Sequence, residues 1–392
     1  MRLGIAALVL GYVLSQFYRA FLAVLAPVLQ TDLGATPAQL ADASGLWFLV
    51  FAAMQIPVGI ALDRIGPRRT VAVTLGVAGA GGVALFAAAQ GPGAIILAMA
   101  LIGVGCSPVL MSSFYIFART YSPAVFGTLA GLLIGVGNLG NLGAALPLSL
   151  AVEVFGWRGT VGALAVVTLI VAGAMWRFIQ DPPQAPVAAG QGGIAQVLRI
   201  PSVWAIFLLL AVGYAPSAAI RGLWVGPYFS DVMAASAAQI GTVTLIMGLA
   251  MVAGNFAYGP MDRLFGSRKW PNLVGNLAGA AVLLALWWTP APGWWAAVGL
   301  IAAVGFFGMS FPLLMAHGRA FFPPHLVGRG VTVLNLFGIG GVGVMQVLSG
   351  RVFTTAAGQA APTAAYGTLF GFFALIMLAG CVAYAFSRDR TD

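Results

Sequence analysis

The sequence predicts an all-α membrane protein with twelve transmembrane helices in two pseudo-symmetric six-helix bundles. Three observations support this fold class: an extreme composition, a series of long apolar runs, and motifs that recur about 200 residues apart. Of the 392 residues, 61% are hydrophobic and only 7% are charged, whereas a soluble domain has about 25% charged residues. Because so few charges could not keep a protein surface in water, we expect the chain to be embedded in a lipid bilayer.

Composition also excludes several classes of function. The chain has 18 Lys and Arg against 9 Asp and Glu, but the basic residues are spread over the ends of apolar runs and form no patch for nucleic acid. Cys106 and Cys381 lie in apolar runs and form no disulfide or metal-binding pattern. There is no Walker A, G-x-S-x-G or zinc motif. We therefore expect neither an enzyme nor a bound cofactor.

Twelve apolar runs are long enough to cross a bilayer, which takes roughly 20 residues per helix. They are too long and too evenly apolar for membrane β-strands, which alternate in polarity over about 10 residues. The first run lacks an A-x-A cleavage site, so we expect a span and not a signal peptide. The predicted spans are 3–29, 40–62, 70–90, 93–118, 128–152, 159–178, 203–228, 239–261, 271–289, 293–318, 330–350 and 365–386.

Basic residues predict the orientation, because cytoplasmic loops of membrane proteins are enriched in Lys and Arg. With the N-terminus inside, only Arg158 and Arg351 fall on the outer side. We expect both termini in the cytoplasm and the chain in a bacterial cytoplasmic membrane. The basic residues predicted inside are Arg2, Arg64, Arg68, Arg69, Arg119, Arg177, Arg199, Arg263, Arg268, Lys269, Arg319, Arg329, Arg388 and Arg390.

A Pro- and Gly-rich stretch, QDPPQAPVAAGQGG, divides the spans six and six. It predicts an N-terminal bundle at 1–179, a cytoplasmic linker at 180–200 and a C-terminal bundle at 201–392. Motifs in one half recur in the corresponding span or loop of the other, 200 to 204 residues later, which indicates an internal duplication. The pairs are GIALDRIGPRR (59–69) with GPMDRLFGSRK (259–269), SPVLM (107–111) with FPLLM (311–315), YSPAVFG (121–127) with FPPHLVG (322–328), and Gly137 and Gly140 with Gly338 and Gly341.

A permanent cation, Arg19, interrupts the first apolar run, GYVLSQFYRAFLAVLAP. A charge in such a place costs from about 3 to over 10 kcal/mol, and usually has a function. Tyr12, Ser15, Gln16 and Arg19 are spaced by three and four residues, so they share one face of a helix. A polar stripe on an apolar helix is expected to face away from lipid.

The same pattern, Y-x2-S-x3-R, recurs 202 residues later as Tyr214, Ser217 and Arg221. Parallel repeats place their solute site at the interface between the halves, near the membrane midplane. We therefore predict that Arg19 and Arg221 bind a solute from opposite sides of a central cavity, supported by the other members of the two patterns. Arginine favours an anionic or carbonyl-rich group. The alternative is a structural role, in which each guanidinium bonds carbonyls across its bundle.

Four further residues are candidates for lining the solute path. Trp47 and Tyr115 could stack on a flat ring, although Trp and Tyr also populate membrane interfaces. Asn138 and Asn335 lie in the glycine-rich fifth and eleventh spans, where they either line the path or join helices. The glycines of these spans indicate close helix packing.

The motif GIALDRIGPRR, its copy GPMDRLFGSRK, the six-plus-six plan and the glycine-rich GLLIGVGNLGNLG resemble the major facilitator superfamily of secondary transporters over the whole chain. The resemblance implies two six-helix bundles that rock to expose the site to alternate sides. It also implies a cytoplasmic gate of carboxylate–guanidinium pairs, which form bidentately. The gate residues would be Asp63, Arg64, Arg68 and Arg69 in the first half, and Asp262, Arg263 and Arg268 in the second. Met99 replaces an arginine that proton-coupled members carry, so proton coupling is not indicated.

More narrowly, FYRAFLAVLAP followed by LGATPAQLADASGLWF is similar to a bacterial branch of copper importers and riboflavin importers. The copper members carry Met-x3-Met and His-x3-Met pairs. This chain has one Met-x3-Met pair, Met247 and Met251, and no His-x3-Met. Thioethers select Cu(I), but methionine also fills irregular gaps in helix packing.

The sequence therefore predicts a monomeric secondary transporter that moves a small polar or anionic solute across the cytoplasmic membrane by alternating access, in the direction of uptake. Import of Cu(I) through Met247 and Met251, or of riboflavin, is the alternative within the same class. A hypothesis of another class is a non-transporting membrane sensor or assembly partner. The sequence does not identify the solute or the coupling ion.

Overall fold

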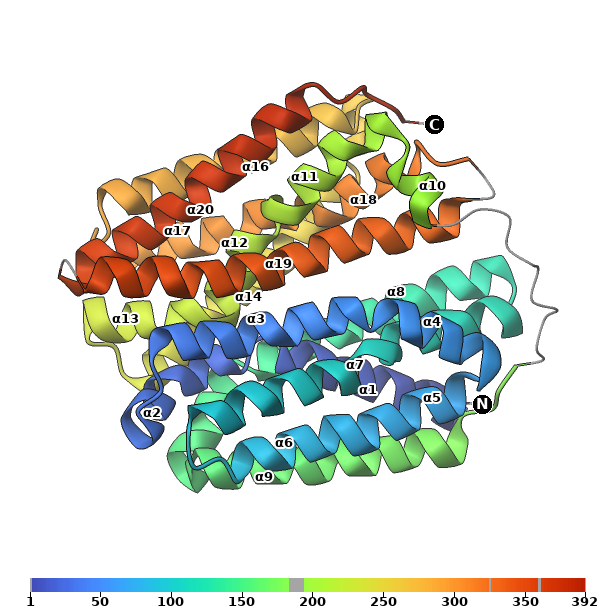
Figure 1. Cartoon of the computed structure of the whole chain (residues 1–392), viewed down its shortest axis with the longest axis horizontal. Helices are drawn as coiled ribbons and strands as arrows, with labels where there is room; N and C mark the ends of the chain where they lie inside the picture. Colours follow the sequence, from blue (N-terminus) through green and yellow to red (C-terminus); the bar gives the residue numbers. More distant parts are fainter. Residues whose placement is uncertain (1, 183–193, 324–325, 359–360, 392) are drawn as a thin grey trace. The chain divides into compact units, whose positions relative to one another are not determined.

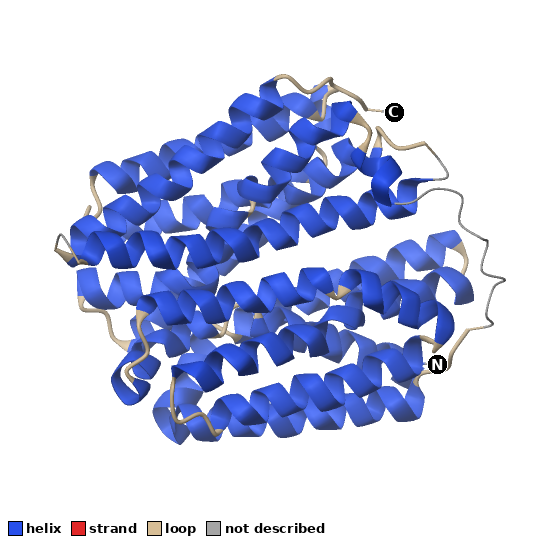
Figure 2. Ribbon diagram, in the orientation of Figure 1, coloured by secondary structure: helices blue, strands red, loops and turns tan. Residues whose placement is uncertain are grey.

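The computed structural model describes residues 2–182, 194–323, 326–358 and 361–391, and within these ranges every regular element is a helix (Figure 2). The chain divides into two compact units, Met1–Ala188 and Ala189–Asp392, and each is described by itself. Most of the predicted linker, residues 183–193, lies outside the described residues.

The helices of the first unit follow its apolar runs, but most predicted spans contain more than one helical segment. Helix α6 and the π-helix η1 pack against α7 and α9 (Figure 1). The elements are α1 (Arg2–Tyr18), α2 (Leu22–Leu33), α3 (Pro37–Ala53), α4 (Gln55–Arg64), α5 (Pro67–Val73), η1 (Thr74–Ala80), α6 (Gly81–Ala87), α7 (Pro92–Thr120), α8 (Pro123–Gly143) and α9 (Leu146–Phe178).

The second unit is also helical, with its first span divided into several segments. Helices α16 and α20 pack along each other. The elements are α10 (Ile194–Leu198), the 3₁₀-helix η2 (Pro201–Val203), α11 (Trp204–Gly213), α12 (Ala215–Ala219), the π-helix η3 (Ile220–Trp224), α13 (Val225–Met233), α14 (Ala237–Tyr258), α15 (Met261–Phe265), α16 (Lys269–Trp288), α17 (Trp294–Phe307), the 3₁₀-helix η4 (Gly308–Ser310), α18 (Phe311–Arg319), α19 (Val327–Ala357) and α20 (Pro362–Ala385).

The start of the second span is specified locally in both units. Thr36 accepts a hydrogen bond from the amide of Gln39 and Gln39 Oε1 accepts one from the amide of Thr36, which forms a capping box at the start of α3. Ser236 and Gln239 form the same box at the start of α14, 200 residues later. Each box satisfies two backbone donors that would otherwise lack partners at a helix start.

Among the described residues, nine helices are long and apolar enough to cross a membrane, or up to eleven spans if each bent pair counts as one. The predicted count of twelve is therefore not confirmed. The predicted fifth span, 128–152, was wrong as a single helix, because α8 ends at Gly143 and α9 starts at Leu146. Helix α9 itself contains Gly156 at φ 69° and ψ 161°, a conformation that is not helical and that glycine adopts readily.

The predicted span 3–29 is not one continuous helix, whereas a single candidate span, Pro201–Met233, covers the predicted span 203–228. The first span is divided into α1 and α2, whose axes differ by 50°, and the seventh passes from α11 and α12 through a π-helical turn into α13. The break at Arg19, Ala20 and Phe21 contains neither glycine nor proline, so the sequence gives no local signal for it, whereas the seventh span has Gly213 and Pro216 at the junction of α11 and α12.

Glycines bring one pair of helices into backbone contact in each unit. A Cβ on Gly140 of α8 would collide with the carbonyl oxygen of Val13 in α1. A Cβ on Gly341 of α19 would collide with the carbonyl oxygen of Ala211 in α11. In a bilayer, helices associate largely through such close van der Waals packing, so the predicted packing role of these glycines is confirmed at these two positions.

Large apolar side chains lie both inside the units and on their outer faces. Trp47 and Trp224 are fully buried, while Val77, Phe256 and Trp288 are 73%, 79% and 84% exposed. An exposed apolar surface of this kind is favourable in contact with lipid tails.

Candidate functional site

Arg19 lies where the first span breaks. Helix α1 ends one residue before it and α2 begins at Leu22. Its Cζ is 5.3 Å from the centre of the Trp47 ring and 4.9 Å from that of Phe51, and these two rings stack at 5.1 Å. Among the described residues no carboxylate pairs with Arg19, and its Nε is buried without a hydrogen-bond partner.

The aromatic contacts compensate only part of the cost of burying this cation. A cation–π contact contributes about 0.5–2 kcal/mol, whereas a buried charge also needs hydrogen bonds in place of those it made to water. Arg19 is half-buried and has donors left over. It is therefore equipped to bind an anionic or carbonyl oxygen.

The rest of the polar stripe on α1 is buried. Gln16 is 8% exposed, and its Oε1 lacks a hydrogen-bond partner within the described part of the chain. Ser15 is 1% exposed. The ring of Tyr12 packs on Gly137 of α8, where a Cβ would collide with it. Gln16 thus adds a second unused polar group one helical turn before Arg19.

Arg221 lies in η3, the π-helical turn of the seventh span, and is 3% exposed. Tyr214, at the junction of α11 and α12, is close enough to interact electrostatically with it. The ring of Tyr214 is 5.4 Å from that of Phe311. In both units, the duplicated arginine therefore occupies the place where the first span departs from an α-helix. Single π-helical turns are rare and frequently occur at functional sites.

Ser217 has a local bonding role. Its Oγ donates a hydrogen bond of 2.6 Å to the carbonyl oxygen of Val304 in α17, and a Cβ on Gly308 would collide with the Ser217 hydroxyl. Ser217 thus holds the seventh span against the tenth at the point where α17 gives way to η4.

The remaining predicted path residues have contacts of their own. Tyr115 lies near the end of α7, with the Cζ of Arg119 4.1 Å from its ring centre. Asn138 of α8 accepts a hydrogen bond of 3.4 Å from Asn141, and Asn335 is half-buried on α19. Within its own unit, Arg19 contacts the rings of Trp47 and Phe51, and Arg221 lies near Tyr214.

Met247 and Met251 share one face of α14, as their spacing predicts. Both side chains lie over Gly305 of α17, where a Cβ would be within 3.0 Å of one and 3.1 Å of the other. Met247 is fully buried. This arrangement is ordinary helix packing. In the described ranges, no group of three or more His, Cys, Asp or Glu could hold a metal ion.

The predicted gate motif of the first unit makes an interaction that sequence reasoning missed. Asp181, which follows α9, accepts a 2.7 Å hydrogen bond from the amide of Arg68, and its Oδ2 is 4.0 Å from Arg68 Nε. Gly66 has φ 94°, and a Cβ there would approach the Asp181 carboxylate to 3.0 Å. Asp181 therefore caps α5, and the motif glycine makes room for it. Asp63, Arg64 and Arg69 are exposed.

The second unit repeats this cap. Asp389, which follows α20, accepts hydrogen bonds from the amides of Arg268 and Lys269, at 3.2 and 3.0 Å. Burial alone would raise the pKa of Asp389, but hydrogen bonds from Ser267, Lys269 and Arg268 outweigh this and lower it. Asp262 is 3.6 Å from Arg268 Nε, so this copy also has the predicted pair within the motif, while Arg263 is exposed.

The signal for these caps was available in the sequence. Asp181 and Asp389 each follow the last helix of a half, at nearly equivalent positions of the duplication. The acids lie 113 and 121 residues from their partners Arg68 and Arg268, so spacing along the chain did not predict this pairing.

Replacing Asp181 or Asp389 by Ala is expected to destabilise the corresponding unit by about 1 kcal/mol or less, the usual cost of an exposed helix cap. For Asp389, the lowered pKa means that its contribution is present above the ordinary pKa of 3.8 and is lost as pH falls below that value. Thermal unfolding in detergent at pH 7 and pH 3 tests this. The Asp389→Asn variant keeps an acceptor, so a loss as large as that of Asp389→Ala would contradict the capping role.

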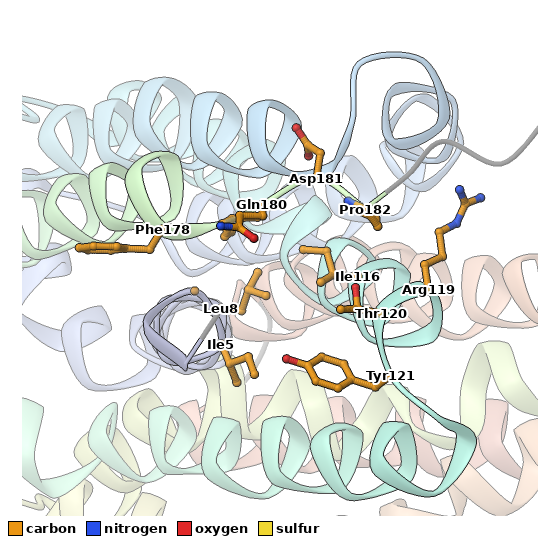
Figure 3. Close-up of a pocket in the computed structure, with 12 residues that line it drawn as sticks. Ile5, Leu8, Ile116, Arg119, Thr120, Tyr121, Phe178, Gln180, Asp181 and Pro182 are labelled. Carbon is orange, nitrogen blue, oxygen red and sulfur yellow. The ribbon is translucent and has the colours of Figure 1, made fainter.

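A cavity of about 300 Å³ lies beside Asp181 in the first unit (Figure 3). The side chain of Tyr121 extends towards Ile5 of α1, while the side chain of Arg119 points away from Ile5 (Figure 3). Sequence reasoning did not predict this cavity. It is lined by Gly4, Ile5, Leu8, Ile116, Arg119, Thr120, Tyr121, Phe178, Ile179, Gln180, Asp181 and Pro182.

Comparison with known proteins identifies a family and a fold. The family model described as Major Facilitator Superfamily matches residues 8–225, and a search of curated proteins gave no match. An inward-facing, occupied bacterial homolog of the human lysosomal transporter Spinster superposes with a TM-score of 0.77 at 16% identity, covering 98% of this chain and 96% of that one. The nucleoside transporter NupG gives 0.78 at 14% identity (98% and 99% covered), and a D-xylose–proton symporter gives 0.71 at 15% (95% and 96%). At these identities, the structural likeness shows the fold alone.

Proposed function

The chain belongs to the Major Facilitator Superfamily, and on that premise we propose that it transports a small polar or anionic solute that is bound by Arg19 and Arg221. It is a multi-pass membrane transport protein. In this proposal, alternating access carries the solute across the membrane in the direction of uptake. Tyr12, Ser15, Gln16 and Trp47 support Arg19, and Tyr214 and Ser217 support Arg221.

One observation carries this proposal: each duplicated arginine lies where the first span of its unit stops being an α-helix. In transporters, interrupted helices at membrane depth commonly form the solute site, because their irregular backbone is tolerated where it lines a cavity. Arg19 supports the proposal further, because no carboxylate among the described residues pairs with it. An anionic solute supplies the missing charge.

In each unit, a carboxylate cap fixes the predicted gate motif at the cytoplasmic side. Asp181 and Asp389 each tie the motif of their own unit to the chain that follows its last helix. In this proposal, Asp63, Arg64 and Arg69, with their copies Asp262 and Arg263, make and break contacts at the cytoplasmic gate. Asp63, Arg64, Arg69 and Arg263 are exposed, which suits this role, because exposed ion pairs are worth only about 0–1 kcal/mol and exchange readily.

Import of Cu(I) remains the alternative that the sequence raised. It relies on Met247 and Met251, whose side chains pack over Gly305. Two thioethers from one helix supply only part of a Cu(I) ligand set, and no observation favours copper over an organic anion. Riboflavin, a flat solute rich in carbonyl groups, falls within the proposed class.

Uptake into proteoliposomes tests the proposal. The full chain is reconstituted and offered organic anions, riboflavin, organic cations and Cu(I), after a thermal-shift screen of the same compounds. We expect an anion or a carbonyl-rich compound to raise the melting temperature and to accumulate. Accumulation of cations only would contradict the site. Copper uptake that is lost in Met247→Leu/Met251→Leu would favour the copper alternative, and failure of every solute to accumulate would favour a sensor or assembly partner.

A further inference from the structure

A second cavity, of about 580 Å³, lies at the end of α18 in the second unit. Three of its lining side chains are arginines, and two more are phenylalanines. It is separate from Arg221, which belongs to η3 of the seventh span. The cavity is lined by Arg268, Ala316, Arg319, Ala320, Phe321, Phe322, Pro323 and Arg390.

Two of the three arginines are held in place by backbone oxygens. Arg268 Nη1 donates to the carbonyl of Ala316 at 3.4 Å, and Arg390 Nη1 donates to that of Ala320 at 3.2 Å. The Cζ of Arg390 is also 5.4 Å from the Phe321 ring centre. These carbonyls belong to the C-terminal end of α18, whose partial negative charge stabilises nearby cations. Backbone oxygens therefore help to hold the guanidinium groups of Arg268 and Arg390 in place.

The carboxylates near the cavity neutralise only part of its charge. Asp262 lies 3.6 Å from Arg268, and Asp389 accepts hydrogen bonds from the amides of Arg268 and Lys269. Lys269 Nζ donates to the carbonyl of Ala385 at 2.6 Å. Within the described ranges, no carboxylate pairs with Arg319 or Arg390. Two cations at the cavity thus remain uncompensated.

The cavity in the first unit is a natural comparison, because it occupies the corresponding place in the duplication. Arg119 there matches Arg319 here, 200 residues later. The first cavity includes Asp181 in its lining (Figure 3), whereas the second has Arg390 from the segment after α20 and no acidic lining residue. Both units therefore have a cavity at this place, but the lining charges are balanced in the first unit and strongly positive in the second.

We propose that the cavity formed by Arg268, Arg319 and Arg390 binds a phosphate group, carried by an anionic phospholipid or by a free phosphate compound. Guanidinium groups match phosphate oxygens with paired hydrogen bonds. The cavity lies on the side predicted to be cytoplasmic, and basic pockets at helix ends on that side suit anionic lipid headgroups. The walls of Phe321 and Phe322 shield the bound group from water on one side. This site is independent of the solute site.

Native mass spectrometry of the delipidated full chain, titrated with phosphatidylglycerol or phosphatidylcholine, tests the proposal. We expect selective retention of phosphatidylglycerol. The variant Arg319→Gln/Arg390→Gln should bind it roughly 30-fold more weakly, since each basic residue near an anionic lipid contributes about 1 kcal/mol, or about fivefold. Arg119→Gln, in the matched cavity, should bind as the unaltered protein does.

Thermal shifts with inorganic phosphate against chloride, at equal ionic strength, separate the two sources of phosphate. A shift with phosphate that is lost in the double variant indicates a free phosphate compound, and retention of phosphatidylglycerol without that shift indicates the lipid. The Arg319→Lys/Arg390→Lys variant keeps both positive charges but lacks the paired guanidinium donors, so its affinity is expected to be intermediate. Intermediate binding also shows that the variant is folded. Equal binding of both ligands to the unaltered protein and the double Gln variant, or no binding of either, would overturn the proposal.

Discussion

Replacing Arg19 or Arg221 by Gln is expected to weaken solute binding by about 10- to 100-fold, since hydrogen bonds to a charged group contribute about 1.5–3 kcal/mol. Both arginines lie where the first span of their unit departs from an α-helix, and in the proposed function each guanidinium donates hydrogen bonds to the solute. The measurement is solute affinity by thermal shift or isothermal titration on purified protein, with uptake into proteoliposomes as the second readout.

A matched control separates binding from simple loss of a cation. Arg351 is exposed on α19, and Arg351→Gln should bind and transport as the unaltered protein does. Melting temperatures without solute test the structural alternative. If Arg19→Gln binds solute normally but melts at a lower temperature, Arg19 stabilises the break and does not bind the solute.

The Arg19→Gln/Arg221→Gln double variant tests whether the two residues act on one solute. If both bind the same anionic group, their effects should be coupled and should deviate from additivity, as for residues that share one partner. Additive losses that affect two different solutes would contradict a shared site.

Replacing Gly140 or Gly341 by Ala is expected to destabilise its unit by about 3 kcal/mol or more. In each case the new Cβ would collide with a backbone carbonyl, of Val13 or of Ala211. A flexible side chain could turn aside, but a helix backbone can only move as a whole, and overpacking of this kind commonly costs 1–3 kcal/mol or more. Displacing α1 would also shift Arg19, so transport should fall as well.

Gly131 of α8 provides the control for this prediction. A Cβ there meets nothing within 4 Å, so Gly131→Ala should be neutral or slightly stabilising, because Ala favours the helix over Gly by up to about 1 kcal/mol. Melting temperature and the yield of monodisperse protein in detergent are the measurements. If Gly140→Ala is as stable as Gly131→Ala, the close approach of α1 and α8 does not exist.

The sequence by itself determined that the chain is embedded in a membrane, that it is helical and duplicated, and that Arg19 and Arg221 are equivalent. These properties depend on composition and on residue spacing along one chain, and 7% charged residues leave no soluble alternative. The capping boxes at Thr36 and Ser236 are equally local, since each involves residues only three apart.

Only the tertiary structure decided where the first spans break and what fixes the gate motifs. Arg19 is followed by Ala and Phe, which do not interrupt helices, and the bend occurs where Trp47 and Phe51 of another helix receive the guanidinium. The helix caps involve residues that are 113 and 120 positions apart in the chain. The close contact between Gly140 and Val13 likewise joins residues that are far apart in the chain. Such contacts depend on which helices become neighbours, and local sequence patterns do not contain that information.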